Sequence, residues 1–215
     1  MRTLFCLLFV FGTAAAWAQD LDFPDFRNKR DNFAKIQDKP LRAEIASFAL
    51  AGVDESIGQA QLKTIPIKGY GGNYMQFEGS DVQGNNIQVT IRTGVFDPHK
   101  HKLMFSEKHL MRIDGKPYYG GNYGDVPKNY ITSITVVVGT DTVPIPPTAY
   151  FDLYDPKFSF NQSGATRTRN SVYLSGDKHT FYIYMLDIDN GGNEYTWVIR
   201  DKTYYRRIVD FGFLK

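Results

Sequence analysis

The sequence is almost without cysteine. Its 215 residues contain a single one, Cys6, which lies in the apolar run at the N-terminus. If that segment is removed, the remaining chain can form no disulfide, no thiolate nucleophile and no cysteine-ligated metal site. Small exported domains often depend on disulfides because their cores are small, but a domain of about 200 residues buries enough surface to fold without them.

The sequence also lacks an excess of charge of either sign. Lys and Arg total 25 and Asp and Glu total 23, which gives a formal net charge of +2. The densest basic stretch, Arg27–Arg30, is interrupted by Asn28 and is followed at once by Asp31. Because nucleic-acid binding needs a concentrated basic surface, we expect no nucleic-acid partner.

No hydrophobic run is long enough to span a membrane. The run Leu4–Phe11 is much shorter than the roughly 20 residues that a transmembrane helix needs. It follows Arg2 and precedes the small-residue pattern Ala16–Ala18, as in a secretory signal peptide. We therefore expect residues 1–18 to be a signal peptide cleaved after Ala18, and the mature protein to be secreted or periplasmic and not membrane-spanning. Export without disulfides favours a bacterial envelope or secreted protein.

Signatures of catalysis are missing as well. The sequence contains no Gly-x-Ser-x-Gly elbow, no His-Glu-x-x-His, no phosphate-binding glycine loop and no dinucleotide fingerprint. We therefore expect a non-catalytic protein without a cofactor. A hydrolase built on a pair of carboxylates stays as an alternative, because a sequence does not show whether two acids face one cleft.

What the sequence does have is aromatic side chains and short apolar alternations. It contains 16 Phe and 14 Tyr, and from residue 41 onward its apolar runs are broken by Gly, Pro, Asn and Asp. This rhythm is typical of antiparallel β-structure. We expect residues 19–40 to form an N-terminal arm, part helical over 26–37. Residues 41–215 should form one all-β domain, a mostly antiparallel β-sandwich of the immunoglobulin-like or jelly-roll-like kind.

Several strands can be predicted individually. Over 87–92, Ile87, Val89 and Ile91 share one face, so only that side should be buried. The segment 180–188 is apolar on both faces, as expected of a central strand between two packed layers. Prolines after residue 143 put the segment 142–145 at a sheet edge or outside the sheet. Further strands are expected at 130–138, 194–200 and 203–213, and a long exposed loop is expected at 159–171.

One short motif occurs twice, as Tyr70–Tyr74 and Tyr119–Tyr123, each reading Tyr-Gly-Gly-Asn-Tyr, with a looser copy at 191–195. Gly-Gly-Asn tolerates positive φ, so each copy predicts a tight turn, and three unrelated turns would explain the motif. The alternative is an aromatic and amide binding surface, because tyrosine rings offer rigid flat area and asparagine both donates and accepts hydrogen bonds. The candidate ligand-binding residues are Tyr70, Asn73, Tyr74, Tyr119, Asn122 and Tyr123.

Two segments could bind a metal ion. His99 and His101 would share a face if their segment is extended, and His109 could add a third ligand, although the neighbouring lysines oppose a cation. Hard oxygen ligands also gather near one predicted hairpin tip, where turn chemistry explains them without calcium. These oxygen-bearing residues are Asp187, Asp189, Asn190, Asn193 and Glu194.

The function we expect from these features is recognition of a glycan or protein surface by aromatic loops on a rigid sandwich. Two alternatives stay open: an envelope metal-handling protein that uses the histidines of 97–109, and a structural or interaction protein with no small ligand.

The signal-peptide prediction can be tested by mass. Expression of the whole chain in a bacterial host should yield an exported protein whose intact mass is that of residues 19–215. Ala18→Phe should block this cleavage, because the position needs a small side chain, whereas Ala14→Ser should leave it unchanged. A protein that keeps residues 1–18 without any substitution would contradict the prediction.

Overall fold

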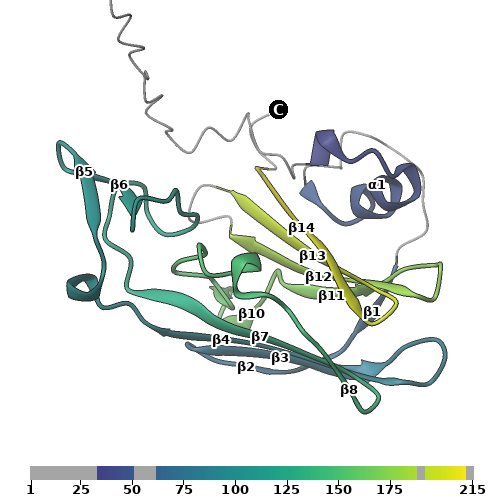
Figure 1. The fold of residues 1–215 in the computed structure, drawn as a ribbon. Helices are drawn as coiled ribbons and strands as arrows, with labels where there is room; N and C mark the ends of the chain where they lie inside the picture. Colours follow the sequence, from purple (N-terminus) through teal and green to yellow (C-terminus); the bar gives the residue numbers. More distant parts are fainter. Residues whose placement is uncertain (1–32, 51–61, 188–191, 212–215) are drawn as a thin grey trace, which may run out of the picture.

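Two five-stranded antiparallel sheets face each other across a shared apolar core (Figure 1). The computed structural model describes residues 33–50, 62–187 and 192–211. The expected signal peptide, most of the expected arm and the tip of the hairpin at 188–191 lie outside these residues. Within the described part, the prediction of an all-β, mostly antiparallel sandwich is confirmed.

In each sheet, strands that are neighbours in space are also, with few exceptions, consecutive along the chain. The first sheet has the order β1-β11-β12-β13-β14 and the second has the order β2-β3-β4-β7-β8. The first consists of β1 (Lys63–Ile65), β11 (Ser171–Leu174), β12 (Thr180–Asp187), β13 (Asn193–Arg200) and β14 (Thr203–Phe211). The second consists of β2 (Ile67–Tyr70), β3 (Tyr74–Ser80), β4 (Asn86–Val95), β7 (Asn129–Val138) and β8 (Asp141–Val143). Both sheets are thus meanders, and only β1 comes from the other half of the chain.

Alternation along the strands sets the inner face of the second sheet. In β4, Ile87, Val89 and Ile91 are all buried, as their spacing predicts. Their partners in β7 are buried too, as are Met75 and Phe77, the β3 partners of Ile91 and Val89. The predicted edge position of 142–145 is also found, since β8 ends the sheet at Val143, just before Pro144.

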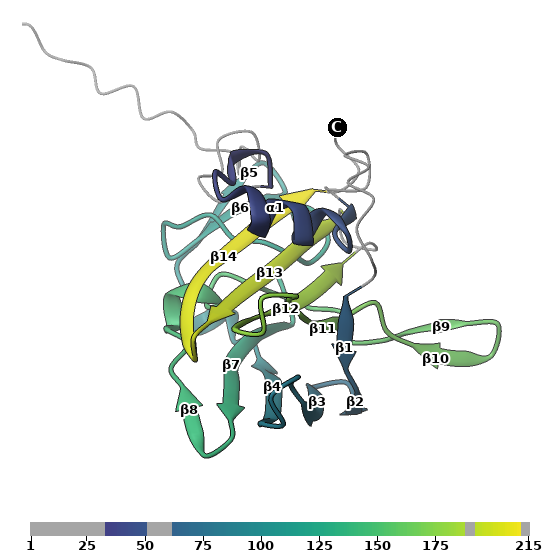
Figure 2. The ribbon, with the colours of Figure 1, turned by 90° about the vertical axis from the view of Figure 1, so that its right-hand side faces the viewer.

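The first sheet is buried on both faces. All eight residues of β12 are buried, which agrees with its predicted central position. Its inner side chains join the core between the sheets, and the outer ones, Tyr182, Tyr184 and Leu186, belong to a second apolar cluster. That cluster includes residues of η2 (Phe33–Lys35) and α1 (Lys39–Ala46), and Figure 2 shows α1 lying over this outer face.

Helix α1 begins after the segment in which helical structure was expected. Of that segment, 26–37, residues 26–32 lie outside the described residues, and residues 33–35 form a 3-10 turn. α1 spans Lys39–Ala46, so residues 41–46, where we expected the β-domain to begin, are helical. The physical reason is capping: the Asp38 side chain accepts a hydrogen bond from the Leu41 amide at 3.1 Å, and Pro40 occupies the first turn.

Glu44 ties α1 to the first sheet. Its side chain accepts hydrogen bonds from the Ser175 hydroxyl and the Gly176 amide, both at 2.9 Å, and from the Tyr182 hydroxyl. Burial and, next, the hydrogen bond to Glu44 raise the pKa of Tyr182 well above its usual value, so this hydroxyl stays protonated as a donor.

Two small hairpins extend from the sandwich. Strands β5 (Leu103–Ser106) and β6 (His109–Ile113) form one, and β9 (Phe160–Gln162) and β10 (Ala165–Arg167) form the other. The second projects from the body in Figure 2 and spans residues 160–167 of the segment 159–171, so most of the loop expected there is an exposed hairpin. Its turn uses Ser163 and Gly164, both with positive φ, a turn signal that the polar composition obscured.

The turn between β13 and β14 is tight and contains no glycine. Asp201 and Lys202 both adopt positive φ, 49° and 56°, although non-glycine residues rarely do. Lys202 forms an ion pair with Asp141 at 2.8 Å, which links this turn to the second sheet.

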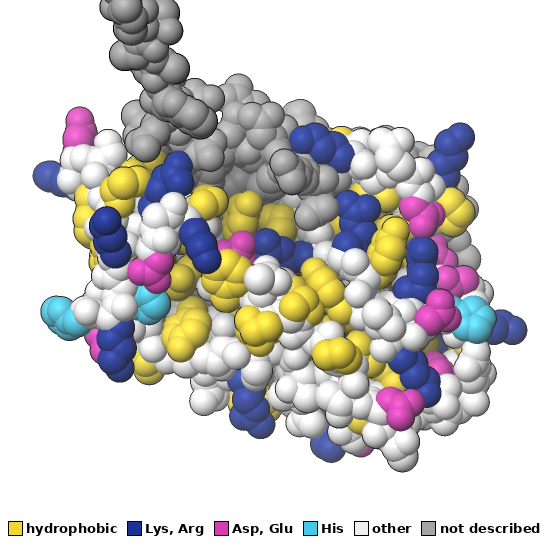
Figure 3. Space-filling view, in the orientation of Figure 1, with side chains coloured by type: hydrophobic (Ala, Val, Ile, Leu, Met, Phe, Trp, Pro, Cys, Tyr) yellow, Lys and Arg dark blue, Asp and Glu magenta, His cyan; other side chains and the backbone are white. Residues whose placement is uncertain are grey.

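A segment after β8 closes the side of the sandwich between β14 and β8. It contains η5 (Pro147–Ala149), and its Ala149 carbonyl accepts hydrogen bonds from the Trp197 indole at 2.8 Å and from the Arg207 guanidinium at 3.1 Å. Arg207 also binds both carboxylate oxygens of Asp152, at 2.5 and 2.9 Å. Hydrophobic side chains gather across the middle of this face (Figure 3), and the half-buried Tyr150 and Tyr204 pack against the core here.

Within the described ranges, no helix has the length and apolar character required to cross a membrane.

The ion pair between Arg207 and Asp152 should matter far more than the exposed pairs. Only about 15% of each side chain is exposed, so Asp152→Asn leaves a largely buried cation without its counter-charge. We expect the free energy of unfolding to fall by about 3 kcal/mol in chemical denaturation. Lys202→Met, which breaks an exposed pair, should change it by less than about 1 kcal/mol. Equal effects would contradict this assignment.

The contribution of Glu44 can be measured in the same way. Glu44→Ala removes the acceptor of three hydrogen bonds and should lower the free energy of unfolding by about 2 kcal/mol. Lys39→Ala, on an exposed position of the same helix, is the control and should change it by less than about 0.5 kcal/mol. A Glu44→Ala protein as stable as the control would show that the helix is held by its apolar face alone.

Candidate functional site

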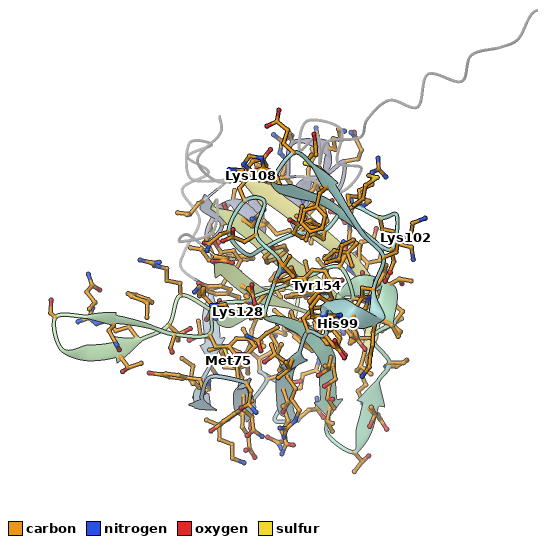
Figure 4. All side chains as sticks on the ribbon, turned by 90° about the vertical axis from the view of Figure 1, so that its left-hand side faces the viewer. Met75, His99, Lys102, Lys108, Lys128 and Tyr154 are labelled. Carbon is orange, nitrogen blue, oxygen red and sulfur yellow. The ribbon has the colours of Figure 1, made fainter. Side chains whose placement is uncertain are left out.

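The two Tyr-Gly-Gly-Asn-Tyr motifs meet at one end of the sandwich. The first forms the turn between β2 and β3, and the second lies in the loop after β6. Gly71 and Gly72 of the first copy and Gly121 and Asn122 of the second line one depression of about 320 Å³. The other residues that line it are Lys128, Asn129, Asp155, Pro156, Lys157, Phe158 and Ser159. Figure 4 views this end of the molecule, with Lys128 and Tyr154 labelled.

The first turn needs glycine for space. The Gly71 amide donates to the Tyr74 carbonyl at 2.9 Å, and a Cβ at Gly71 would lie 2.9 Å from the Tyr74 ring. Neither Gly71 nor Gly72 has positive φ, so the conformational reason expected from the motif does not apply to this copy. Close packing of the ring on the backbone is the reason instead.

The second turn needs glycine for both conformation and space. Gly120 and Gly121 have φ of 83° and 71°, and a Cβ on Gly120 would lie 2.1 Å from the Tyr154 carbonyl oxygen. This close approach exists because Tyr119 exchanges backbone hydrogen bonds of 2.8 Å with Asp152 and Tyr154. The second copy is therefore fixed to the segment that follows η5.

The four tyrosines of the motifs point in different directions. Tyr70 packs against the core and donates its hydroxyl to the Thr166 carbonyl at 3.0 Å, and Tyr74 covers Gly69 and Gly71. The Tyr119 ring also packs against the core, near the Arg207 guanidinium, which lies 5.8 Å away.

Tyr123 completes the set and is 73% exposed beside His109. The six candidate residues therefore do not form a single aromatic platform. Asn122 lines the depression and Asn73 is exposed at the first turn, whereas the rings lie around them.

Asp155 is the fixed wall of the depression. Its carboxylate accepts hydrogen bonds from the Lys128 amide at 3.0 and 3.2 Å and from the Asn129 amide at 2.8 Å. Its own amide donates to the Asn129 carbonyl at 3.0 Å, and its backbone has a positive φ of 43°. Such a conformation costs free energy and persists only when the surroundings hold it, so this wall is preorganised.

Lys157 and Asn122 contribute further polar groups to the lining of the depression. Lys157 is exposed, but its carbonyl accepts a hydrogen bond of 2.9 Å from the buried Asn170 side chain, and the next residue, Phe158, is buried. The Asn122 amide group donates to Asp125 at 3.2 Å. The depression thus offers two ammonium groups, side-chain amides and one carboxylate to a ligand, over a base that does not need to rearrange.

Sequence reasoning missed every lining residue outside the two motifs, among them the polar Lys128, Asn129, Asp155 and Lys157. A signal existed for one of them, since Asp-Pro at 155–156 is typical of a turn after a short apolar run. Lys128 and Asn129 come to the site through the pairing of β4 with β7, and the Lys157 backbone is held by the side chain of Asn170. No local pattern predicts either of these long-range contacts.

The histidines do not converge. The condition under which His99 and His101 would share a face, an extended segment, is not met at His99. This residue lies in η4 (Pro98–Lys100), which is capped by Asp97, whose side chain accepts a hydrogen bond from the His99 amide at 3.1 Å. His101 lies 2.7 Å from Asp114 and stacks on Phe96.

His109 pairs with Ser106, next to the turn at the far end of the β5–β6 ladder. Figure 4 shows His99 well apart from Lys108, the residue before His109. Among the described residues, no group of three or more His, Cys, Asp or Glu side chains is placed to hold a metal ion, so the metal alternative gains no support.

The expected oxygen-rich hairpin tip lies partly outside the described residues, which include Asp187, Asn193 and Glu194 but not 188–191. These three are buried, and Glu194 accepts a hydrogen bond of 3.1 Å from the Tyr184 hydroxyl. The depression itself is lined by one carboxylate, Asp155, whereas a glycoside hydrolase requires two facing the substrate.

No protein-family model matches this chain, and no curated protein and no solved structure matches it either.

Proposed function

We propose that this protein is an exported, non-catalytic binding module that recognises a carbohydrate at the depression between the two Gly-Gly-Asn turns. The observation that carries the proposal is the convergence of two turns, about 50 residues apart in the sequence, on one polar concavity. Binding residues placed on loops over a rigid sandwich are a common arrangement.

The chemistry of the lining favours a sugar. Each sugar hydroxyl both donates and accepts a hydrogen bond, and Asn122 and Asn129 can do the same, while Lys128 and Lys157 donate. The volume of about 320 Å³ is at the lower limit for small-ligand sites, so the end of an oligosaccharide fits better than a long chain. Pro156 supplies an apolar surface for the less polar side of a sugar ring.

A protein partner is the second candidate, because apolar side chains are exposed at the same end of the molecule. Phe105 of β5 is 48% exposed, Tyr123 is 73% exposed, and Val95 at the end of β4 is 82% exposed. Exposed aromatic residues are enriched in protein interfaces. This surface lies beside the depression rather than in it, so the two candidates can be separated by substitution.

Glycan binding can be tested with a glycan array of residues 19–215, followed by calorimetry with the strongest oligosaccharide. Lys157→Ala should weaken binding by about tenfold or more, because it removes a charged donor, and Asn122→Ala should weaken it by about fivefold. Neither substitution should change the free energy of unfolding by more than about 0.5 kcal/mol, because both residues are exposed.

Lys108→Ala, at the tip of the β5–β6 hairpin, is the matched control and should bind as strongly as the unaltered protein. If Phe105→Ala abolishes a protein interaction while the array stays empty, the second candidate is correct. An empty array and no effect of Phe105→Ala would reject both.

A further inference from the structure

A second cavity lies at the opposite end of the sandwich. It has a volume of about 260 Å³ and opens between the turns at 81–85, 175–179 and 201–202. Strand β7 runs from Asn129, at the depression, to Val138, at this cavity, which separates the two by about 30 Å. The inference drawn from this cavity does not rest on the proposed carbohydrate function.

The floor of the cavity is the end of the apolar core. Ile87 and Val138 come from the second sheet, and Leu174 and Phe181 come from the first. All four are at least 94% buried. Both sheets contribute side chains to this floor, so a flexible hydrocarbon chain that enters the cavity can contact the apolar residues of both sheets.

The two acids of the rim already have partners. Asp81 accepts hydrogen bonds of 2.8 Å from the Gln83 amide, the Asn85 amide and the Asn85 side chain. Burial alone would raise the pKa of Asp81, but these hydrogen bonds lower it. The carboxylate therefore stabilises the turn at 81–85, to which it belongs. Asp201 lies 3.4 Å from the ring of His179.

Of the two lysines at the rim, Lys178 and Lys202, only Lys202 is in an ion pair among the described residues. Lys202 is paired with Asp141 at 2.8 Å, but among the described residues the Lys178 ammonium has no carboxylate within ion-pair distance. Lys178 lies at the mouth of the cavity and is exposed, so a ligand can reach its charge.

Two exposed contacts span the mouth between the sheets. The Gln83 side chain donates to the Lys178 carbonyl at 3.3 Å, and Lys202 binds Asp141. Exposed contacts of this kind each contribute about 1 kcal/mol or less to stability, so a ligand that separates them on entering loses little binding free energy.

We propose that this cavity binds an unbranched alkanoate, with the hydrocarbon chain between the two sheets and the carboxylate at Lys178. The apolar floor excludes a fully polar ligand, and the uncommitted ammonium selects an anionic head over a cationic one. The volume, just below the range of about 300–1,000 Å³ for drug-sized ligands, limits the chain to a short or medium length.

The chain-length dependence is the first test. Hexanoate, octanoate, decanoate and dodecanoate are titrated into residues 19–215 by calorimetry, each below its micellar concentration. The dissociation constant should fall by about fourfold per added methylene until the cavity is filled, and then stay constant. Octylamine should bind at least about threefold more weakly than octanoate. No saturable binding of any alkanoate would overturn the proposal.

Two substitutions locate the site. Lys178→Gln should weaken octanoate binding by about threefold to fivefold and leave octanol binding unchanged, and Lys108→Gln, on the far hairpin, is its control. Val138→Phe should fill the cavity and abolish binding of both octanoate and octanol, provided that circular dichroism shows a folded protein.

A third measurement locates the site without any substitution. In nuclear magnetic resonance spectra of the unaltered protein, octanoate should shift amide signals of 81–85, 175–179 and 201–202. Shifts confined to the Gly-Gly-Asn turns would place the alkanoate elsewhere and overturn the inference. Because Lys178 and Lys157 lie at opposite ends, loss of alkanoate binding and loss of glycan binding are separate results.

Discussion

The bidentate pair between Arg207 and Asp152 is the interaction on which the candidate site depends most. It joins β14 to the segment after η5, with Ala149 held by Arg207 and by Trp197. That segment continues to Leu153, which forms a β-bridge with Tyr119, and to Tyr154, whose amide donates to the Tyr119 carbonyl. It ends at Asp155, whose carboxylate accepts from the Asn129 amide at the start of β7. This charge pair thus holds the segment to which the second Gly-Gly-Asn turn is hydrogen-bonded.

The two sheets are stabilised differently. The second sheet buries one face and alternates apolar and polar side chains, as an antiparallel sheet with one solvated face does. The first sheet buries both faces, and its outer face needs α1 and η2 as a third layer. Stacking of Phe48 on Tyr173, with a ring separation of 4.3 Å, and the hydrogen bonds of Glu44 fasten that layer. Aromatic residues are therefore used mainly for packing in this protein, which accounts for much of their abundance.

How much of the structure could be predicted depends on the range of the interactions. The strand that contains Ile87, Val89 and Ile91 could be predicted because a two-residue alternation is a local pattern. The central strand at 180–188 could be predicted for the same reason, from its continuous apolar run. The short α1 could not be placed, because eight residues give too few turns for a clear period. The Gly-Gly-Asn motifs predicted turns, but their meeting depends on the register of β3, β4 and β7. The directions of Tyr70 and Tyr119 depend on core packing, which the motif does not contain.

The β9–β10 hairpin divides the chain in an unusual way. Every strand of the second sheet precedes its turn at Ser163 and Gly164, and every strand of the first sheet except β1 follows it. A single break at this exposed turn would yield two fragments, each with an almost complete sheet, whose contact surface is the core of the sandwich. The earlier fragment would also contain β1, which pairs with β11 of the later fragment and so joins the two through backbone hydrogen bonds. The topology therefore gives each part of the chain most of one sheet, and the core forms where the two parts meet.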